Sequence, residues 1–252
     1  VMNHLARLNT NGTLDATFQN GLVAAQGLPE GAVGGIALQP DDKLIIGGYF
    51  SSVHGVPRKS IARLHADGTL DSAFQNGMKG VSGRVNPVLV QPDGKVLIAG
   101  NFARVNGAMR NGVARLNADG SLDETFMNGL GGTEAGATVY CMALQPDGKV
   151  LIGGTFRRVN GWSCSHIARL NPDGSSDAFF DGEANSYVHA LALQADGRIV
   201  LGGQFSAVNN VARSLVARLE PDGALDATFQ VSVSGGMHPK VATIALDGGW
   251  KV

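Results

Sequence analysis

The sequence predicts an all-β protein, a five-bladed β-propeller made of four-stranded antiparallel blades, and two recurring phrases predict it. A phrase of the form IARLNPDGSSDAFF occurs five times, with its arginine at Arg7, Arg63, Arg115, Arg169 and Arg218. A second phrase, of the form CMALQPDGKVLIGG, precedes each of the four later copies. The arginines lie 56, 52, 54 and 49 residues apart, a period typical of repeat proteins in which each unit packs on its neighbours.

Each phrase consists of two apolar segments joined by a short turn. In the turn Pro146-Asp147-Gly148, the proline presets φ and the glycine takes the left-handed conformation, which is the geometry of a three-residue hairpin. Each unit therefore has four strands, expected in the third unit at residues 139–145, 149–154, 166–171 and 175–180. Short strands without helical periodicity indicate a propeller, whereas an elongated β-solenoid, the alternative, usually has shorter repeats.

The turn geometry also predicts which residues face each other in the second hairpin. Around the turn at residues 66–68, Leu64 should face Leu70 and Arg63 should face Asp71. The same offset of eight residues gives one ion pair per unit: Arg7–Asp15, Arg63–Asp71, Arg115–Asp123, Arg169–Asp177 and Arg218–Asp226. An exposed pair across a ladder contributes roughly 0.2–1 kcal/mol. Recurrence in every unit favours a partly buried structural clamp over the alternative, a ring of anion-binding arginines.

Nine of the ten phenylalanines occupy two fixed positions of the repeat. One position follows the second strand, and the other lies three residues after the aspartate of the ion pair: Phe50, Phe102, Phe156 and Phe205; and Phe18, Phe74, Phe126, Phe180 and Phe229. Large rings at fixed places are what packing between adjacent blades requires, so we expect these rings in the core.

The ends of the chain predict how the ring closes. Four blades are expected at about residues 33–75, 85–127, 139–180 and 188–230, and a fifth from residues 241–252 together with 1–18. The last blade thus combines the C-terminal first and second strands with the N-terminal third and fourth strands. Because the chain starts inside a loop and stops inside a strand, we expect a single propeller domain that is a fragment of a longer protein, and six or more blades remain an alternative.

Composition narrows the classes of partner. The formal net charge is −1, from 20 basic and 21 acidic residues, and no basic run occurs, which argues against nucleic acid and anionic membranes as partners. Charged residues make up 16% of the chain, against about 25% in typical soluble proteins, a style common in secreted β proteins. No apolar stretch reaches the roughly 18 residues that span a bilayer, so no membrane insertion is expected.

The sequence carries no catalytic motif, and we expect no enzyme activity, no cofactor and no metal. The turn from Asn117 to Asp123 resembles a calcium loop, but Arg115 stands where such a loop needs an acid. The six histidines lie in different units without ligand spacing. The two cysteines, Cys141 and Cys164, belong to one unit and are expected about 9–10 Å apart, because one strand lies between theirs. A disulfide would need a folded-back loop, and their redox state stays open.

The loops between the second and third strands are the best candidates for ligand binding. Each carries a valine followed by histidine or asparagine, and three carry an arginine at one position, where the fourth has Cys164. The candidate residues are His54, Arg58, Asn106, Arg110, Asn160, Trp162, Asn209 and Arg213. They could bind a sugar or a carboxylate several times per ring, with a gain in avidity. The structural alternative is that asparagine and glycine form turns while arginine caps strand ends. Tyr140 and His189 are weaker candidates at the central opening.

The combination of ALQPDGKVLIGG, a following phenylalanine, VNG and IARLNPDG resembles the delta-60 repeat family of bacterial β-propeller-like modules over nearly the whole chain. Departures from the pattern are Asp42 at a turn glycine, Ser176 at a leucine of the fourth strand, and Gly249-Trp250 in the last unit. The resemblance implies a large secreted or surface-associated bacterial protein, and no catalytic residues are assigned to the family.

These observations favour a non-enzymatic extracellular scaffold or interaction module of a bacterial surface or secreted protein, with an unknown protein or glycan partner. The alternative is a multivalent carbohydrate-binding, lectin-like propeller that uses the rim formed by the loops between the second and third strands. A propeller enzyme is the third hypothesis, and the near-uniform repeats argue against it.

Overall fold

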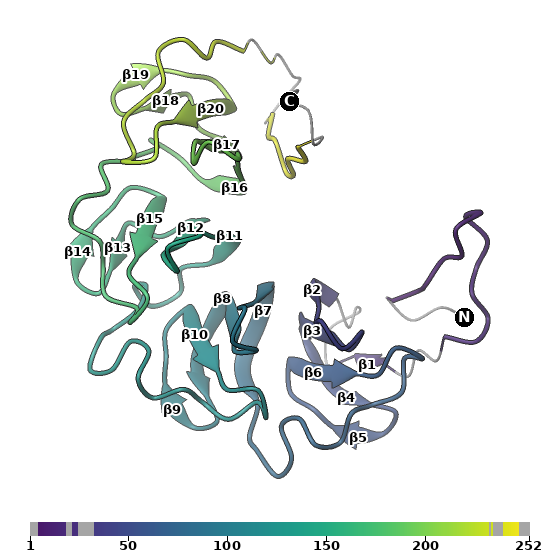
Figure 1. Cartoon of the computed structure of the whole chain (residues 1–252). Helices are drawn as coiled ribbons and strands as arrows, with labels where there is room; N and C mark the ends of the chain where they lie inside the picture. The colour runs from purple at the N-terminus through teal and green to yellow at the C-terminus, as the bar shows by residue number, and fades with distance from the viewer. Residues whose placement is uncertain (1–4, 19–21, 25–32, 232, 234–238, 247–252) are drawn as a thin grey trace. The chain divides into compact units, whose positions relative to one another are not determined.

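The computed structural model describes residues 5–18, 22–24, 33–231, 233 and 239–246, and these residues contain β-strands and turns but no helix (Figure 1). Accordingly, no described segment could cross a membrane as a helix. The chain forms two compact units, Val1–Asp123 and Glu124–Val252, and each holds two blades with their own core.

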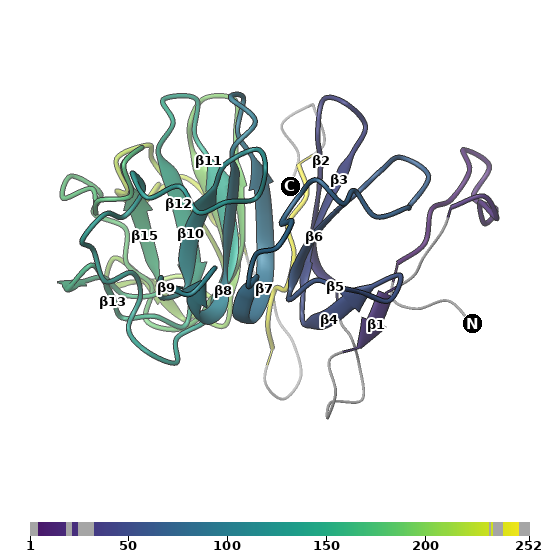
Figure 2. The same cartoon turned by 90° about the horizontal axis from the view of Figure 1, so that it is seen from below.

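The blades of the first unit are antiparallel sheets (Figure 2): a three-stranded sheet in the order β2-β3-β6, and a four-stranded sheet in the order β7-β8-β10 with β9 also paired to β8. The strands are β2 (Val33–Leu38), β3 (Leu44–Gly48), β6 (Ile61–Leu64), β7 (Val81–Val90), β8 (Val96–Val105) and β10 (Val113–Leu116). Short strands complete the unit: β1 (Leu22–Ala24), β4 (Phe50–Val53) and β5 (Val56–Pro57) form a third sheet in the order β1-β4-β5, and β9 is Ala108–Met109.

The second unit repeats this plan in the sheets β11-β12-β15 and β16-β17-β20. The strands are β11 (Val139–Leu144), β12 (Val150–Gly154), β15 (Ile167–Leu170), β16 (Val188–Leu193), β17 (Ile199–Gly203) and β20 (Val216–Leu219). Two small hairpins complete it: β13 (Arg158–Val159) with β14 (Trp162–Ser163), and β18 (Ala207–Val208) with β19 (Val211–Ala212).

The fourth strand predicted for each blade is reduced to a single bridge, although its register is the predicted one. Leu64 faces Leu70, and the other four repeats have the equivalent bridge, including Leu170 opposite Ser176, where serine replaces the leucine. The chain leaves the ladder at the next residue because the aspartate forms a local turn. Asp177 Oδ1 accepts the N–H of Phe179 at 3.0 Å, and Asp177 O accepts the N–H of Phe180 at 3.3 Å. Such turns compete with strand pairing.

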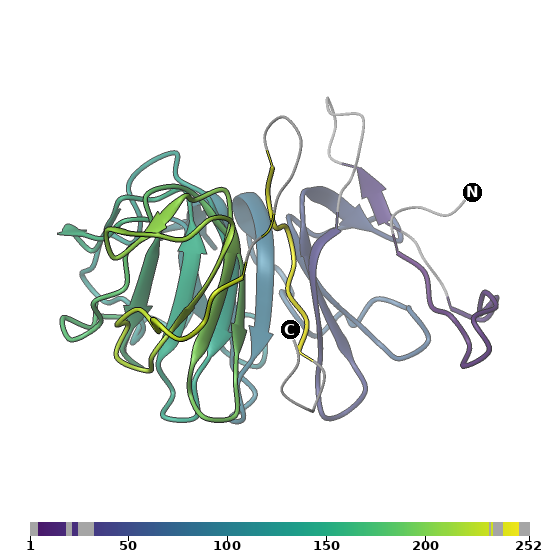
Figure 3. The ribbon, with the colours of Figure 1, turned by 90° about the horizontal axis from the view of Figure 1, so that it is seen from above.

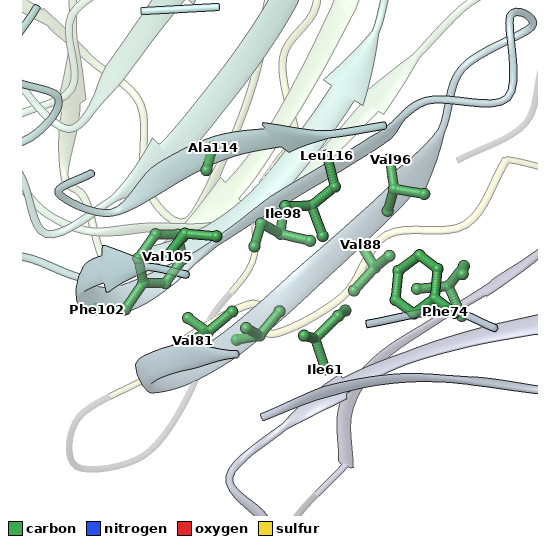
Figure 4. Close-up of a cluster of buried hydrophobic side chains, with 12 residues drawn as sticks. Ile61, Phe74, Val81, Val88, Val96, Ile98, Phe102, Val105, Ala114 and Leu116 are labelled. Atoms are coloured by element: carbon green, nitrogen blue, oxygen red, sulfur yellow. The ribbon is translucent and has the colours of Figure 1, made fainter. Parts of the chain in front are cut away.

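The core forms where the inner strands of neighbouring blades meet. In the first unit, Ile61 and Phe74 of one blade pack with Val88, Ile98 and other residues of the next (Figure 4). Several of the repeated phenylalanines are fully buried: Phe50, Phe74, Phe126, Phe156 and Phe205. Phe179, the one ring outside the two repeated positions, is 87% exposed. The predicted core role of the repeated rings is therefore confirmed at these five positions.

Two glycines end the second strand of most blades, and the packing explains both. A Cβ atom on Gly154 would overlap the carbonyl oxygen of Thr138, the residue just before β11 of the same blade, and Gly100 and Gly203 face equivalent carbonyls. A Cβ on the preceding Gly153 would instead lie 2.7 Å from Cγ1 of Val188 in the next blade. Gly154 thus allows the first strand of its own blade to approach closely, and Gly153 allows the neighbouring blade to do so.

Residues 239–246 follow the last complete blade as an extended segment, drawn in yellow in Figure 3. The N–H of Val241 donates to Gly203 O at 3.1 Å, and a Cβ on Gly202 would meet Val241. Val241 therefore packs on β17 as Val188 packs on β12. The rest of the predicted closing hairpin, residues 247–252, lies outside the described residues, as do residues 1–4.

Candidate functional site

The five predicted arginine–aspartate pairs are present, and each is an internal clamp. The Nε atoms donate to Oδ2 of the aspartate at distances of 2.7–2.9 Å: Arg7–Asp15, Arg63–Asp71, Arg115–Asp123, Arg169–Asp177 and Arg218–Asp226. A lysine shares the carboxylate in three of these units, from Lys43 at 3.3 Å, Lys95 at 2.9 Å and Lys149 at 3.0 Å.

The remaining donors of these arginines bind neighbouring groups of the protein. Arg63 Nη1 donates to Ala118 O in the turn of the next blade at 2.7 Å, and Arg169 Nη1 donates to Pro221 O in the same way. The guanidinium of Arg63 also lies 4.9 Å from the centre of the Phe74 ring. Arg63 and Arg169, each bound to its aspartate and to a carbonyl of the next blade, therefore join adjacent blades. This geometry agrees with a structural clamp.

Acid should weaken the protein through these carboxylates. Hydrogen bonds from Thr228 lower the pKa of Asp226, and Arg218 adds to this effect. Burial acts in the opposite direction, and the resulting pKa is about 2 instead of 3.8. A lowered pKa means that the ionised group stabilises the fold above pH 3.8, and this contribution is lost as pH falls toward about 2. Urea unfolding at a series of pH values should show this loss, and the Asp226→Asn variant should show a smaller acid dependence. An unchanged acid dependence in the variant would contradict the role of Asp226.

The loops between the second and third strands are hairpins with type I′ turns. The first turn residues, His54, Asn106, Asn160 and Asn209, have φ between 47 and 53°, and the residue that follows also has positive φ. Positive φ at both central residues is the type I′ geometry, whose twist matches that of the flanking strands. Asparagine and glycine tolerate this conformation best, which explains the recurring Asn-Gly.

The four turn side chains are engaged inside the protein. Asn160 Nδ2 donates to Gly174 O at 3.0 Å, and Asn160 Oδ1 accepts the N–H of Gly132 at 3.0 Å. Asn106 and Asn209 make the equivalent bonds, and His54 Nε2 lies 3.2 Å from Gly68 O. These side chains fasten each hairpin to the turn of its own blade and to the incoming connector.

Replacing Asn209 with alanine should therefore destabilise the protein more than the same change at Asn210. Both residues have positive φ, but the side chain of Asn209 alone bonds Glu183 N at 2.8 Å and Gly223 O at 2.9 Å. The difference between the two variants should be about 1–3 kcal/mol in the free energy of unfolding, measured with denaturant. Equal losses would mean that backbone strain, not these hydrogen bonds, decides the cost.

Three arginines occupy one position of the hairpins and fold back on the main chain. Arg58, Arg110 and Arg213 each donate Nη1 to the carbonyl of the preceding residue, at 2.7–2.8 Å. Their Nε atoms are buried without a hydrogen-bond partner in the described part of the chain. Arg58 is only 8% exposed. These arginines therefore fill space beside the third strand as well as carrying charge.

The third blade has Cys164 at this position, and a pocket of about 200 Å³ lies beside it. Its lining includes Trp162, Ser163, Cys164, Ser176 and Ala178, together with the connector from Phe180 to Glu183. Of the residues predicted to bind a ligand, Trp162 alone lines this pocket, and it is 66% exposed; the predicted ion pair Arg169–Asp177 lines it as well. The sequence signals for the pocket were Cys164 and Ser176, two departures from the repeat within one unit.

The cysteines are free thiols rather than a disulfide. Burial raises the pKa of Cys164 to about 12, and the charges of Glu134 and Glu183 add to this effect. Burial also raises the pKa of Cys141. Both thiols are therefore protonated at neutral pH, which argues against a role as nucleophiles.

Tyr140 and His189, the weaker candidates, lie together in the second unit. Their rings stack with centroids 4.5 Å apart, and Tyr187 meets His189 edge-on at 6.5 Å. Among the described residues, no group of three histidine, cysteine or acidic side chains is arranged to hold a metal ion.

Comparison with known families decides the family of the chain. The model described as "Domain of unknown function (DUF5122) beta-propeller" matches residues 3–18, 39–74, 91–126, 145–180 and 194–229, the segments that carry the repeated hairpins. The chain belongs to this family. The DUF5122 match agrees with the β-propeller fold that the repeats predict, and a comparison with curated proteins gave no match.

Solved structures similar to this DUF5122 chain share its fold at low sequence identity. The extracellular domain of a putative one component system from B. thetaiotaomicron is 12% identical, with a TM-score of 0.56 over 96% of this chain and 28% of that one. Virginiamycin B lyase from Staphylococcus aureus is 16% identical, with a TM-score of 0.50 over 85% of this chain and 60% of that one. The DUF5122 chain thus spans less than two thirds of either protein.

The lyase corrects one expectation from the sequence. Near-uniform repeats and the lack of a catalytic motif led us to expect a protein that is not an enzyme. Virginiamycin B lyase has this fold and is, by its name, an enzyme. That expectation was therefore wrong, because the same fold serves enzymes as well as proteins that are not enzymes.

Proposed function

We propose that this DUF5122 domain is an extracellular scaffold or interaction module within a larger bacterial surface or secreted protein. The proposal includes a five-bladed ring, with residues 241–252 and 1–18 sharing the last blade, and repeats of the delta-60 kind. It is supported by the five matches of the repeat model and by the low charge content of 16%. The likeness to the extracellular domain of a putative one component system from B. thetaiotaomicron agrees with it in fold.

The pocket beside Trp162 carries the proposal. A blade with a purely structural role needs only the contacts that recur in every repeat. In three of the blades an arginine stands at the position of Cys164. The third blade replaces that arginine with Cys164, the leucine with Ser176, and exposes a tryptophan at the edge. Exposed aromatic rings beside a cavity are typical of binding surfaces.

Surface labelling tests the location. An epitope inserted in the exposed turn at Pro146 and Asp147, within the natural full-length protein, should be accessible to antibody on intact bacteria. The same epitope inserted at Asp196, in the equivalent turn of the next blade, serves as a second position. Labelling that occurs only after the cells are lysed would contradict an extracellular role.

Carbohydrate binding is the second candidate, and the exposed ring of Trp162 favours it. A flat aromatic face can stack on a sugar, while Asp181 and Glu183 offer hydrogen-bond acceptors in the same pocket. The proposal also extends to the equivalent positions His54, Arg58, Asn106, Arg110, Asn160, Asn209 and Arg213. A glycan array with the Trp162→Val variant as control tests it, since Val211 occupies the equivalent place in the next blade. A flat response over a broad panel would set this candidate aside.

A further inference from the structure

The repeat itself shows what fits the pocket of the third blade. In all four hairpins the residue at the arginine position donates its backbone N–H seven residues back, from Arg58 to Ser51 O, from Arg110 to Ala103 O, from Cys164 to Arg157 O and from Arg213 to Ser206 O, at 2.9–3.0 Å. The four main chains are therefore equivalent here, and Cys164 begins where the three arginine side chains begin.

Two carbonyl groups receive the guanidinium in the first blade. Arg58 Nη1 donates to Pro57 O at 2.8 Å, and Arg58 Nη2 donates to Ser72 O at 3.3 Å. In the third blade the corresponding residues are Ser163 and Ala178, and both line the pocket. The pocket thus contains the place of the missing guanidinium and residues that carry its acceptors.

Two other changes in the third blade enlarge the same space. Ser176 stands where Leu70, Leu122 and Leu225 stand in the other units. The connector is also shorter: Phe180 is followed three residues later by Glu183, whose N–H binds the asparagine of the next hairpin. The equivalent step in the first unit runs six residues, from Phe74 to Gly80.

The charge and the rings of the pocket suit a cation. Asp181 and Glu183 line it, and their carboxylates form no salt bridge within the described part of the chain. Arg169 and Asp177 also line the pocket, and Asp177 pairs with both Arg169, at 2.7 Å, and Lys149, at 3.0 Å. Trp162 is 66% exposed at the pocket, and a guanidinium stacks well on the face of an indole ring.

We propose that the pocket formed by Trp162, Ser163, Cys164, Ala178 and Glu183 binds the guanidinium of an arginine side chain presented by a partner protein. The bound side chain takes the place that the repeat's own arginine takes in the other blades. Its planar donors face the two carbonyl groups, while Glu183 balances its charge and Trp162 covers it. This inference rests on the proposed role as an interaction module.

Titration with a small probe tests the site directly. The probe is N-acetyl-L-arginine methylamide, and the readout is the fluorescence of Trp162 in a Trp250→Phe background, because the chain has two tryptophans. We expect saturable binding with a Kd in the millimolar range. The citrulline analogue has nearly the same shape without the charge, and it should bind about tenfold more weakly or not at all. No saturable response to the arginine probe, or an equal response to citrulline, would overturn the proposal.

The repeat supplies the decisive variant. Cys164→Arg should fill the pocket from within and abolish probe binding, while Cys164→Ser should retain it. The melting temperature of Cys164→Arg shows whether the variant folds, and we expect no decrease because three blades carry this arginine. Should it fail to fold, Glu183→Gln provides a milder variant, in which the Kd should rise about fivefold or more through loss of one charge. Probe binding that survives both changes would contradict the site.

The result of the probe titration can be distinguished from the result of surface labelling. A domain that binds the arginine probe but is labelled only in lysed cells would keep this inference and lose the extracellular role. A domain that is labelled on intact cells but ignores the probe would keep the role and lose this pocket.

Discussion

Replacing Asp177 with alanine is expected to lower the free energy of unfolding by about 3–5 kcal/mol. The side chain of Asp177 is only 3% exposed and balances two cations, Arg169 at 2.7 Å and Lys149 at 3.0 Å. Arg169 is itself 8% exposed in its side chain. Without the carboxylate, this buried guanidinium would lose its charge partner, and its desolvation would no longer be offset.

The measurement is denaturant unfolding of the intact domain, with Asp147→Ala as the matched control. Asp147 lies in an exposed turn of the same blade, and among the described residues its side chain accepts only the backbone N–H of Lys149, at 3.1 Å. Its loss should cost about 0.5–1.5 kcal/mol. A double variant with Arg169→Met and Asp177→Leu should recover much of the stability, because it leaves no unpaired charge. Equal losses for Asp177→Ala and Asp147→Ala would show that the pair does not clamp the blade.

Replacing Gly154 with alanine is expected to cost about 3 kcal/mol or more. Its Cβ would overlap the main-chain oxygen of Thr138, so the first and second strands of the blade would have to separate. The main chain at this point is fixed by a hydrogen bond from the N–H of Gly154 to His166 O, at 3.0 Å. Relief of the overlap would therefore strain or break ladder bonds on both sides of β12.

Gly153→Ala is the control for this effect. Its Cβ would press on side-chain atoms, Cys141 Sγ and Val188 Cγ1, both at 2.7 Å, and side chains can rotate or shift. The equivalent position in the second blade is already an alanine, Ala99. In thermal unfolding, the melting temperature of Gly154→Ala should therefore be well below that of Gly153→Ala. The reverse order would mean that the inter-blade contact, not the main-chain approach, requires glycine.

The hairpins and their register could be predicted from the sequence because a Pro-Asp-Gly turn sets the facing residues by chemistry alone. The offset of eight residues gave Arg63 opposite Asp71, and the rings at fixed positions gave the core. The fourth strand could not be read in this way. Its apolar residue, such as Leu70, alternates as in a strand, but the local turn made by Asp71 ends the ladder one residue later.

The pocket was harder to predict because it arises from what the third blade lacks. Each change is ordinary when taken singly: a cysteine in a loop, a serine in a strand, and a connector shortened by three residues. Only the shared fold brings Cys164, Ser176 and Glu183 around the space that an arginine fills elsewhere. A comparison of the units position by position, with attention to lost volume, would have indicated it.

The arginine that reaches from one blade to the turn of the next has a consequence for how such chains evolve. Three of the repeat arginines make this connection, Arg7 to Ala66 O, Arg63 to Ala118 O and Arg169 to Pro221 O, and the turn that supplies the carbonyl recurs in the repeat. Duplication of a gene segment that encodes one whole repeat would therefore supply both the arginine and the carbonyl for the hydrogen bonds to its neighbours. Natural arrays of these units can lengthen or shorten by whole steps without inventing a new interface.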